Sequence, residues 1–346
     1  MAGKDKPDYA ALIKELKDKG PDRLYLLWGD EDYLKEQFLR ELVKMTVGSE
    51  NTEFNRKYVD FKDPDPRVLY EAVETMPFFS SETLVEVRNF DINKCRDETG
   101  ERIKEIINDI PDYCVIAFVA DTGVEPDGRL GLVKAVKKTG KSLEFAGQEQ
   151  SLLLRWIERR FEANGKKIKK AEAEHLIFTG GGLMNGLIPE IDKISGYAEG
   201  EYVTIGDIDA VARRIPEAGV FSMTDMLAAG NYDAAARILS ELIQMREAPI
   251  RMTAVIGRQM RHLLAAKVAA DEGLKKDFVS EVCGIKFDFI VTKLMKAASG
   301  FSFARLIKAV KTCAEYDYKM KTSAEDDTEL IKELFVRLSL KEEEDA

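Results

Sequence analysis

Residues 24–34 read Leu24-Tyr25-Leu26-Leu27-Trp28-Gly29-Asp30-Glu31-Asp32-Tyr33-Leu34, an apolar run that ends at Gly29 before a helical pattern begins. In an α/β protein, the first strand-turn-helix is where a phosphate-binding loop would lie. Such a loop needs several glycines and a lysine followed by serine or threonine. This turn has one glycine, no lysine and three carboxylates, whose charge would repel a triphosphate. The sequence therefore predicts the layout of a nucleotide enzyme without its phosphate loop.

Strand and helix signals alternate around this turn, through residue 145. The predicted strands cover residues 24–28, 58–61, 83–87, 114–120 and 142–145. The predicted helices cover residues 33–47, 66–76, 101–110 and 129–138. Because strands separated by helices form parallel sheets with right-handed crossovers, we expect one mostly parallel sheet. The segment 114–120 is strongly apolar, so we expect it at the centre of the sheet.

Only helices are predicted after residue 145. Leu153, Trp156, Ile157 and Phe161 are spaced as one face of a helix, which Asn164-Gly165 then ends. Two or three further helices are expected up to residue 214, and residues 215–219 are interpreted as a linker. The last predicted helices cover 224–229, 232–245, 249–270, 287–297, 303–320 and 328–338.

The predicted fold class is therefore α/β plus all-α, in three domains. Residues 1–146 would form the α/β domain with the parallel sheet. Residues 147–215 would form a small helical lid domain, and residues 216–346 a helical collar that serves oligomerisation. The first two domains have the plan of an ATPase module with its lid.

The composition is that of a globular protein with a negative net charge. Of the 346 residues, 45% are hydrophobic and 33% are charged, and the formal net charge is -10. This charge argues against a stand-alone DNA-binding protein, although it leaves room for local basic patches. No apolar run approaches the roughly 18–20 residues of a membrane span, and residues 1–8 lack the apolar segment of a signal peptide. We therefore expect a cytoplasmic protein with no membrane partner.

Cysteines and histidines offer no metal site or catalytic set. The four cysteines lie far apart without a C-x-x-C pair, which fits reduced cytosolic thiols. His175 and His262 each stand alone on a helical pattern, and we expect both to be surface or packing residues. No Ser/His/Asp, Cys/His or paired-carboxylate set has catalytic spacing. We therefore expect no catalytic residue, no metal ion and no cofactor.

The sharpest binding candidates are Met76, Pro77, Phe78 and Phe79, between a predicted helix and a predicted strand. Pro77 is expected to end the helix near Met76 and to turn the chain outward. Two adjacent aromatic side chains cannot both face one side of a regular element, so at least one ring would be exposed. Exposed aromatic rings at a loop tip are typical binding anchors. The alternative is that both rings pack under the strand 83–87, and the residues alone leave both interpretations open.

Five short motifs, in this order and spacing, carry a resemblance to a known family. They are residues 25–34, Met76-Pro77-Phe78-Phe79-Ser80-Ser81-Glu82-Thr83-Leu84-Val85, Leu154-Arg155-Trp156-Ile157, Glu190-Ile191-Asp192-Lys193 before Tyr197, and Gly219-Val220-Phe221-Ser222. Over nearly its whole length, the chain resembles the delta subunit of bacterial DNA polymerase III, which is part of the sliding-clamp loader.

The resemblance implies an AAA+-like fold with a collar domain that assembles a five-subunit ring. Members of this family do not hydrolyse ATP; they bind the ring-shaped sliding clamp (beta) and favour an opened clamp interface. The implied partners are the clamp, the tau/gamma and delta-prime subunits through the collar, and primed DNA within the complex. The chain would be a non-catalytic part of a DNA-directed DNA polymerase (nucleotidyltransferase) holoenzyme. The alternatives are a degenerate AAA+ nucleotide-dependent ATPase and a single-stranded nucleic-acid binding module.

The resemblance also implies roles for individual residues. In the family, the hydrophobic pair that matches Phe78 and Phe79 plugs a pocket on the clamp. Active neighbours in these rings present a Ser-Arg-Cys arginine finger, whose charge meets the charge that develops in phosphoryl transfer. This chain has no Ser-Arg-Cys, and its nearest stretch is Lys94-Cys95-Arg96. We therefore expect that the chain neither binds ATP nor completes a neighbour's site.

Two groups of basic residues are candidates for contact with DNA or another subunit. Lys166 and Lys167 begin a lysine run after the helix stop, and Arg251 and Arg258 lie on a long predicted helix. Either group could touch DNA phosphates or an acidic protein surface. The alternative is that these charges are only solvated.

Overall fold

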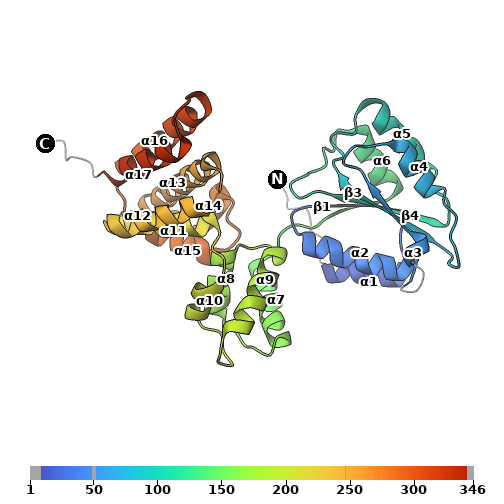
Figure 1. Ribbon diagram of the computed structural model, residues 1–346, viewed down its shortest axis with the longest axis horizontal. Helices are drawn as coiled ribbons and strands as arrows, with labels where there is room; N and C mark the ends of the chain where they lie inside the picture. The colour runs from blue at the N-terminus through green and yellow to red at the C-terminus, as the bar shows by residue number, and fades with distance from the viewer. Residues whose placement is uncertain (1–8, 49–51, 246, 341–346) are drawn as a thin grey trace. The chain divides into compact units, whose positions relative to one another are not determined.

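The computed structural model describes residues 9–48, 52–245 and 247–340 of the chain (Figure 1). It divides into two compact units. Unit 1 comprises Met1–Gln148 with the short segment Leu183–Asn185, and unit 2 comprises Glu149–Gly182 with Gly186–Ala346. Among the described residues, no helix combines the length and the apolar character needed to cross a membrane.

Unit 1 is built on a five-stranded sheet in which every strand pair is parallel. The strands follow the order β2-β3-β4-β1-β5. Their bounds are β1 Leu24–Trp28, β2 Arg56–Asp60, β3 Thr83–Phe90, β4 Cys114–Ala120 and β5 Lys141–Glu144. All residues of β4 are buried, as expected for a strand covered on both faces. The prediction of a parallel sheet with the segment 114–120 at its centre is confirmed.

Helices cover both faces of this sheet (Figure 1). One face carries α1 (Tyr9–Lys19) and α2 (Asp32–Thr46); the other carries α4 (Pro66–Val73), α5 (Asp97–Asn108) and α6 (Gly131–Thr139). On the α2 face, Phe38 packs edge-on against Tyr25, with ring centroids 5.5 Å apart. On the other face, Leu69, Ile103 and Val133 share one hydrophobic core with the strands. The short helix α3 (Thr52–Asn55) directly precedes β2, and neither α1 nor α3 was predicted from the sequence.

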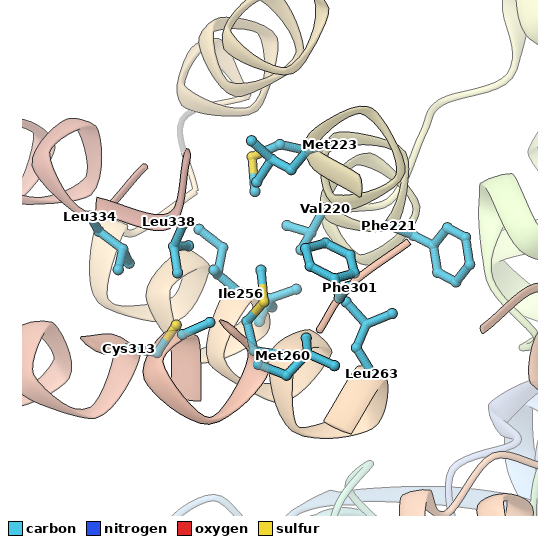
Figure 2. Packing of buried hydrophobic residues seen from close by; sticks show 14 of the residues in the cluster. Val220, Phe221, Met223, Ile256, Met260, Leu263, Phe301, Cys313, Leu334 and Leu338 are labelled. Carbon is cyan, nitrogen blue, oxygen red and sulfur yellow. The ribbon is translucent and has the colours of Figure 1, made fainter. Parts of the chain in front are cut away.

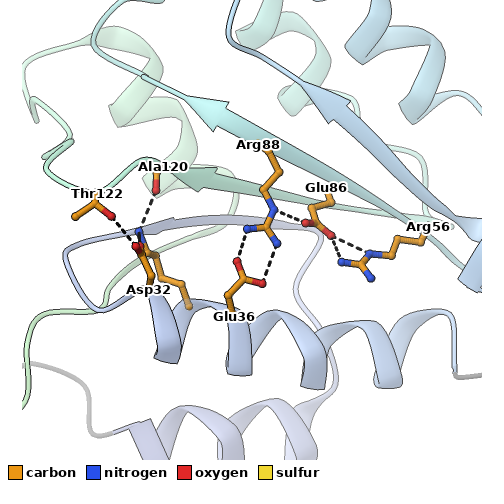
Figure 3. Close-up of polar contacts among 8 residues, drawn as sticks. Asp32, Glu36, Arg56, Glu86, Arg88, Ala120 and Thr122 are labelled. Carbon is orange, nitrogen blue, oxygen red and sulfur yellow. Dashed lines mark hydrogen bonds and ion pairs between the residues drawn. The ribbon is translucent and has the colours of Figure 1, made fainter. Parts of the chain in front are cut away.

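A network of charged side chains joins α2 to the sheet (Figure 3). Arg88 on β3 donates to both carboxylate oxygens of Glu36 on α2 and to one oxygen of Glu86. Arg56 on β2 donates to the other oxygen of Glu86 at 2.8 Å. Because Glu86 is only 1% exposed, its charge is tolerated there only while the arginines neutralise it. The network therefore fixes α2, and the turn before it, against the sheet.

Unit 2 is helical. The helices are α7 Gln150–Ala163, α8 Lys170–Gly180, α9 Met184–Tyr197, α10 Ile205–Val211, α11 Pro216–Ala228, α12 Tyr232–Gln244, α13 Pro249–Asp271, α14 Lys276–Cys283, α15 Asp288–Ala298, α16 Phe303–Thr322 and α17 Asp327–Ser339. The first two residues of α9, Met184 and Asn185, belong to unit 1. One large core surrounds the long helix α13, where Ile256, Met260 and Leu263 lie in one cluster with Val220 of α11 and with Phe301 (Figure 2). Helix α14 was not predicted from the sequence.

The predicted linker at residues 215–219 is wrong, because α11 begins there. Ile215 is the N-cap and Pro216 is the first helical residue. Proline suits this position because the N–H that it lacks would have no helical acceptor in the first turn. Gly219 permits a close helix contact, since a Cβ atom there would lie 2.6 Å from Cδ2 of Leu242 on α12. The proline and the glycine thus mark a helix start and a close contact between helices.

Candidate functional site

Residues Met76, Pro77, Phe78 and Phe79, here called the aromatic tip, precede the amino-terminal end of β3. Helix α4 ends at Val73, three residues before the predicted end at residue 76. The residue before a proline is disfavoured in helical conformation, which explains why Met76, the last of these three residues, is not helical. In α/β enzymes, ligands bind at the carboxyl ends of the strands. The aromatic tip therefore lies at the opposite edge of the sheet from a nucleotide site.

The side chains of the tip point into solvent. Met76 is 76% exposed, Phe78 53% and Phe79 83%. The alternative in which both rings pack under β3 is therefore wrong. The two rings contact each other at a centroid distance of 4.3 Å and an interplanar angle of 64°. An edge-on aromatic pair of this kind forms one apolar surface with a fixed shape.

Phe79 has an unusual backbone conformation. Its φ angle is +52°, in the left-handed region that bulky residues rarely adopt. Asn89 is the other non-glycine residue with positive φ in the described part of the chain, and asparagine tolerates this region far better. Backbone strain at an exposed aromatic residue is a reason to look for function, because packing does not explain it.

A third exposed ring adjoins the tip, and no sequence pattern predicted it. Phe54 on α3 is 57% exposed, and its ring centroid lies 5.5 Å from that of Phe78. The residue belongs to a different element from the tip, so neither spacing nor periodicity connects the two. Together Phe54, Phe78 and Phe79 form an exposed surface of three aromatic rings.

The turn after β1 is closed by its own backbone. Gly29 has a φ angle of +112°, and a Cβ atom there would lie 2.5 Å from the carbonyl oxygen of Phe145. The N–H of Glu31 donates to that same carbonyl oxygen at 2.8 Å. A phosphate cradle uses such N–H groups for its ligand. Here the carbonyl oxygen of Phe145 accepts the N–H of Glu31, so that N–H is not available to a phosphate.

Two of the carboxylates of this turn, Glu31 and Asp32, are also engaged. Glu31 is fully buried and accepts the N–H of Met184, a residue of the same unit, at 3.2 Å. Burial raises the pKa of its carboxyl group to about 7. Asp32 pairs with the buried Lys35 at 2.7 Å and accepts a hydrogen bond from Thr122 at 2.7 Å (Figure 3). The ammonium group of Lys35 is therefore committed to a carboxylate of the chain.

The predicted basic residues Lys166 and Lys167 lie between α7 and α8. Lys166 donates to the carbonyl oxygens of Ala198 and Gly200, the latter at 2.9 Å. Lys167 pairs with Glu201 at 2.7 Å. Both lysines therefore fasten this loop to the segment after α9, and a DNA phosphate would have to compete with these contacts.

The predicted basic residues Arg251 and Arg258 form a separate group on α13. Arg251 pairs with Glu247 at 3.3 Å, and Arg258 pairs with Glu217 of α11 at 2.8 Å. Nearby, His262 is partly buried, and burial together with Arg258 and Arg261 lowers its pKa to about 4. Surface ion pairs of this kind contribute little to stability.

The fold and the site together define a class of protein: an α/β unit with a parallel sheet joined to a helical unit, with its phosphate-loop position closed by its own backbone. The chain belongs to the DNA polymerase III delta subunit family. A family profile described as DNA polymerase III, delta subunit, matches residues 25–146. A second profile, described as the C-terminal domain of the DNA polymerase III delta subunit, matches residues 217–338.

Known proteins are similar to the chain over almost its full length. It is 26% identical to DNA polymerase III subunit delta of Bacillus subtilis (strain 168) over 339 residues, which is 96% of each chain. It is 23% identical to a probable DNA polymerase III subunit delta of Aquifex aeolicus (strain VF5) over 327 residues, 90% of each chain. The solved structure of the Bacillus subtilis DNA clamp loader delta protein YqeN matches 96% of this chain and 99% of its own, with a TM-score of 0.54 and 24% identity. The fold class expected from the sequence, α/β plus all-α with one parallel sheet, is thereby confirmed.

Proposed function

We propose that this chain is the clamp-binding subunit of a DNA polymerase III clamp loader. It binds the sliding clamp through the aromatic tip and favours the opened clamp, so that the clamp can be loaded onto primed DNA. The observation that carries this proposal is the pair of exposed rings, Phe78 and Phe79, on a strained loop at the edge of the sheet. Family membership supports it, because a relative of similar fold is named as a clamp loader delta protein.

The energetics of the tip suit a binding anchor. An aromatic ring of this size buries about 150–250 Å² when it enters a pocket. Central aromatic anchors cost roughly 2 kcal/mol or more of binding free energy when they are truncated to alanine. Two such rings side by side would supply much of the affinity of a transient complex. Opening the clamp then requires that the tip binds the open clamp more tightly than the closed one, because only a difference in affinity shifts an equilibrium.

In this scheme, other subunits of the complex bind and hydrolyse ATP. The N–H of Glu31 and the ammonium of Lys35 are used within unit 1, and the carboxylates of the turn would repel a triphosphate. Residues 147–215 would serve as an inactive lid. Residues 216–346 would serve as the collar that joins tau/gamma and delta-prime subunits in a cytoplasmic replication complex. Contact of Lys166, Lys167, Arg251 or Arg258 with DNA or with a neighbouring subunit stays a prediction within this scheme.

The test is a titration of the full chain with the sliding clamp of the same organism. Phe78→Ala and Phe79→Ala should each weaken the complex, and the double variant should weaken it further. Thermal unfolding must show the wild-type midpoint, because the exposed rings add little to the core. A double variant that binds the clamp as tightly as the wild type would refute the assignment of the aromatic tip as the clamp-binding site.

A further inference from the structure

The aromatic tip is tied to unit 1 by one buried polar side chain. Asn55, the last residue of α3, is fully buried. Its amide nitrogen donates to the carbonyl oxygen of Phe78 at 2.7 Å, and its amide oxygen accepts the N–H of Phe78 at 2.6 Å. Both backbone groups of one tip residue are thus bound by a single side chain. This two-point contact fixes the position and the orientation of the peptide groups on either side of Phe78.

The contact acts directly on the strained residue. Phe79 follows Phe78, so the bound carbonyl group of Phe78 belongs to the peptide that leads into the left-handed residue. A free loop would relax toward the common backbone regions, because the left-handed region is unfavourable for a residue with a Cβ atom. Anchoring Phe78 on Asn55 resists that relaxation. The ring of Phe79 is then held outward, at 83% exposure, before any partner arrives.

The same short helix brings the third ring to the tip. Phe54 precedes Asn55 in α3, and its ring lies 5.5 Å from the ring of Phe78. The hydrogen bonds of Asn55 and the ring of Phe54 therefore act on Phe78 from neighbouring positions of one element. Aromatic rings pre-ordered in this way lose less conformational freedom on binding than a mobile loop would.

We infer that α3 is the support of the clamp-binding surface: Asn55 is a positioning residue that pre-forms the tip, and Phe54 is a third anchor beside Phe78 and Phe79. The inference rests on the proposed function of the tip and extends it from a two-residue wedge to a surface of three rings on two elements. The partner surface that fits it is an apolar pocket wide enough for adjoining aromatic rings. Asn55 contributes without touching the partner, because it is buried.

The expected effect follows from the population of the bound conformation. If the tip is ordered in only a fraction of the molecules, the apparent dissociation constant rises by the inverse of that fraction. Given the modest net contribution of each hydrogen bond, loss of both in Asn55→Ala should leave about one molecule in ten with the tip in place. The affinity for the clamp should then fall about tenfold. Phe54→Ala removes an exposed ring only and should weaken binding at least about threefold, below the loss expected from a central anchor.

A matched control exists in the same unit. Asn93 also makes a two-point bridge to backbone, through donation to the carbonyl oxygen of Glu125 and acceptance of the N–H of Asp127, both at 2.9 Å. It follows β3, and so lies at the opposite edge of the sheet from the tip. Asn93→Ala removes the same chemistry from a loop outside the proposed surface, and it should leave clamp affinity unchanged.

The experiment compares clamp titrations of the full chain as wild type, Asn55→Ala, Phe54→Ala and Asn93→Ala, with thermal midpoints measured alongside. Hydrogen exchange at the amide of Phe78 gives a readout in the free protein. This amide should be protected in the wild type and in Asn93→Ala, and should exchange rapidly in Asn55→Ala. In a Phe79→Ala background, the effect of Asn55→Ala on affinity should shrink to about threefold or less, because the ring that it positions is gone.

The outcomes separate this inference from the proposed function. If Phe78→Ala and Phe79→Ala weaken clamp binding but Asn55→Ala binds like the wild type, the positioning role of Asn55 is overturned and the tip assignment stands. An unprotected Phe78 amide in the wild type also overturns it. Unchanged affinity in Phe54→Ala overturns the third anchor. If the Phe78→Ala/Phe79→Ala variant binds the clamp like the wild type, the proposed function of the tip is refuted, and the inference that rests on it is refuted too.

Discussion

Replacement of Glu31 by glutamine should stabilise the folded chain at neutral pH. Glu31 lies fully buried in the turn after β1, where its carboxylate accepts the N–H of Met184. Burial raises its pKa from the ordinary 4.5 to about 7, and the charges of Asp32 and Asp30 act in the same direction. Glutamine resembles the protonated acid and keeps an oxygen that can accept the same hydrogen bond.

The magnitude and the pH window follow from linkage. The folded chain holds a proton on Glu31 that the unfolded chain releases between pH 4.5 and about 7. The free energy of unfolding therefore falls as the pH rises through this window, and the loss is complete above it. A pKa difference of about 2.5 corresponds to about 3 kcal/mol, an upper value because local relaxation reduces it. The variant should gain about 2–3 kcal/mol at pH 8 and almost nothing at pH 4.5.

Denaturant unfolding of the full chain measures this gain. In a Trp156→Phe background, the fluorescence of Trp28 reports on the region of the turn, because Trp28 ends β1. Glu149→Gln is a matched control, since Glu149 is also the residue before a helix but is exposed. Its effect on the free energy of unfolding should stay small, because the side chain is exposed. If Glu31→Gln is no more stable than the wild type at pH 8, or if its effect does not change with pH, the assignment of Glu31 as a buried, protonatable group is refuted.

Three further predictions concern single residues. Gly29→Ala should lower the free energy of unfolding by more than about 2 kcal/mol, because its new Cβ atom would meet the carbonyl oxygen of Phe145 at 2.5 Å; a thermal midpoint close to that of the wild type would contradict this. Phe79→Gly should be more stable than Phe79→Ala by about 1 kcal/mol, since only glycine adopts a φ angle of +52° without strain, and equal stabilities would argue against that conformation. Burial lowers the pKa of His262 to about 4, so the free energy of unfolding should be highest above pH 6.5 and should fall as the pH drops toward 4. His262→Gln should reduce this loss of stability at acid pH, and an unchanged loss in the variant would argue against the burial of His262.

The sheet was predictable because its strands can be recognised from apolar runs in the local sequence. The apolar run of β1 ends in a turn, and the uniform burial of β4 appears in the sequence as seven apolar residues in succession. Helix starts that contain proline or glycine were harder to predict, because these residues are also typical of linkers. Pro216 and Gly219 suggested a linker, whereas one begins α11 and the other gives space to Leu242. That second role depends on α12, whose contact with α11 no local pattern of sequence reveals.

The site was partly predictable for the same reason. Pro77 and the adjacent rings of Phe78 and Phe79 form a local pattern, and their exposure could be argued from it. Phe54 and Asn55 could not be found in this way, because their contacts with Phe78 join segments that are separate in sequence. The role of the rings in clamp binding stays a prediction.

The proposed function depends on a tip that binds the opened clamp more tightly than the closed one. The direct measurement is the ratio of two affinities of the full chain: for the closed clamp ring, and for a clamp whose subunit interface has been broken by substitution. We expect tighter binding to the broken-interface clamp, and loss of that preference in the Phe78→Ala/Phe79→Ala variant. Equal affinity of the wild-type chain for both forms of the clamp would refute the opening role of the tip, because a ligand that binds both forms equally does not shift their equilibrium.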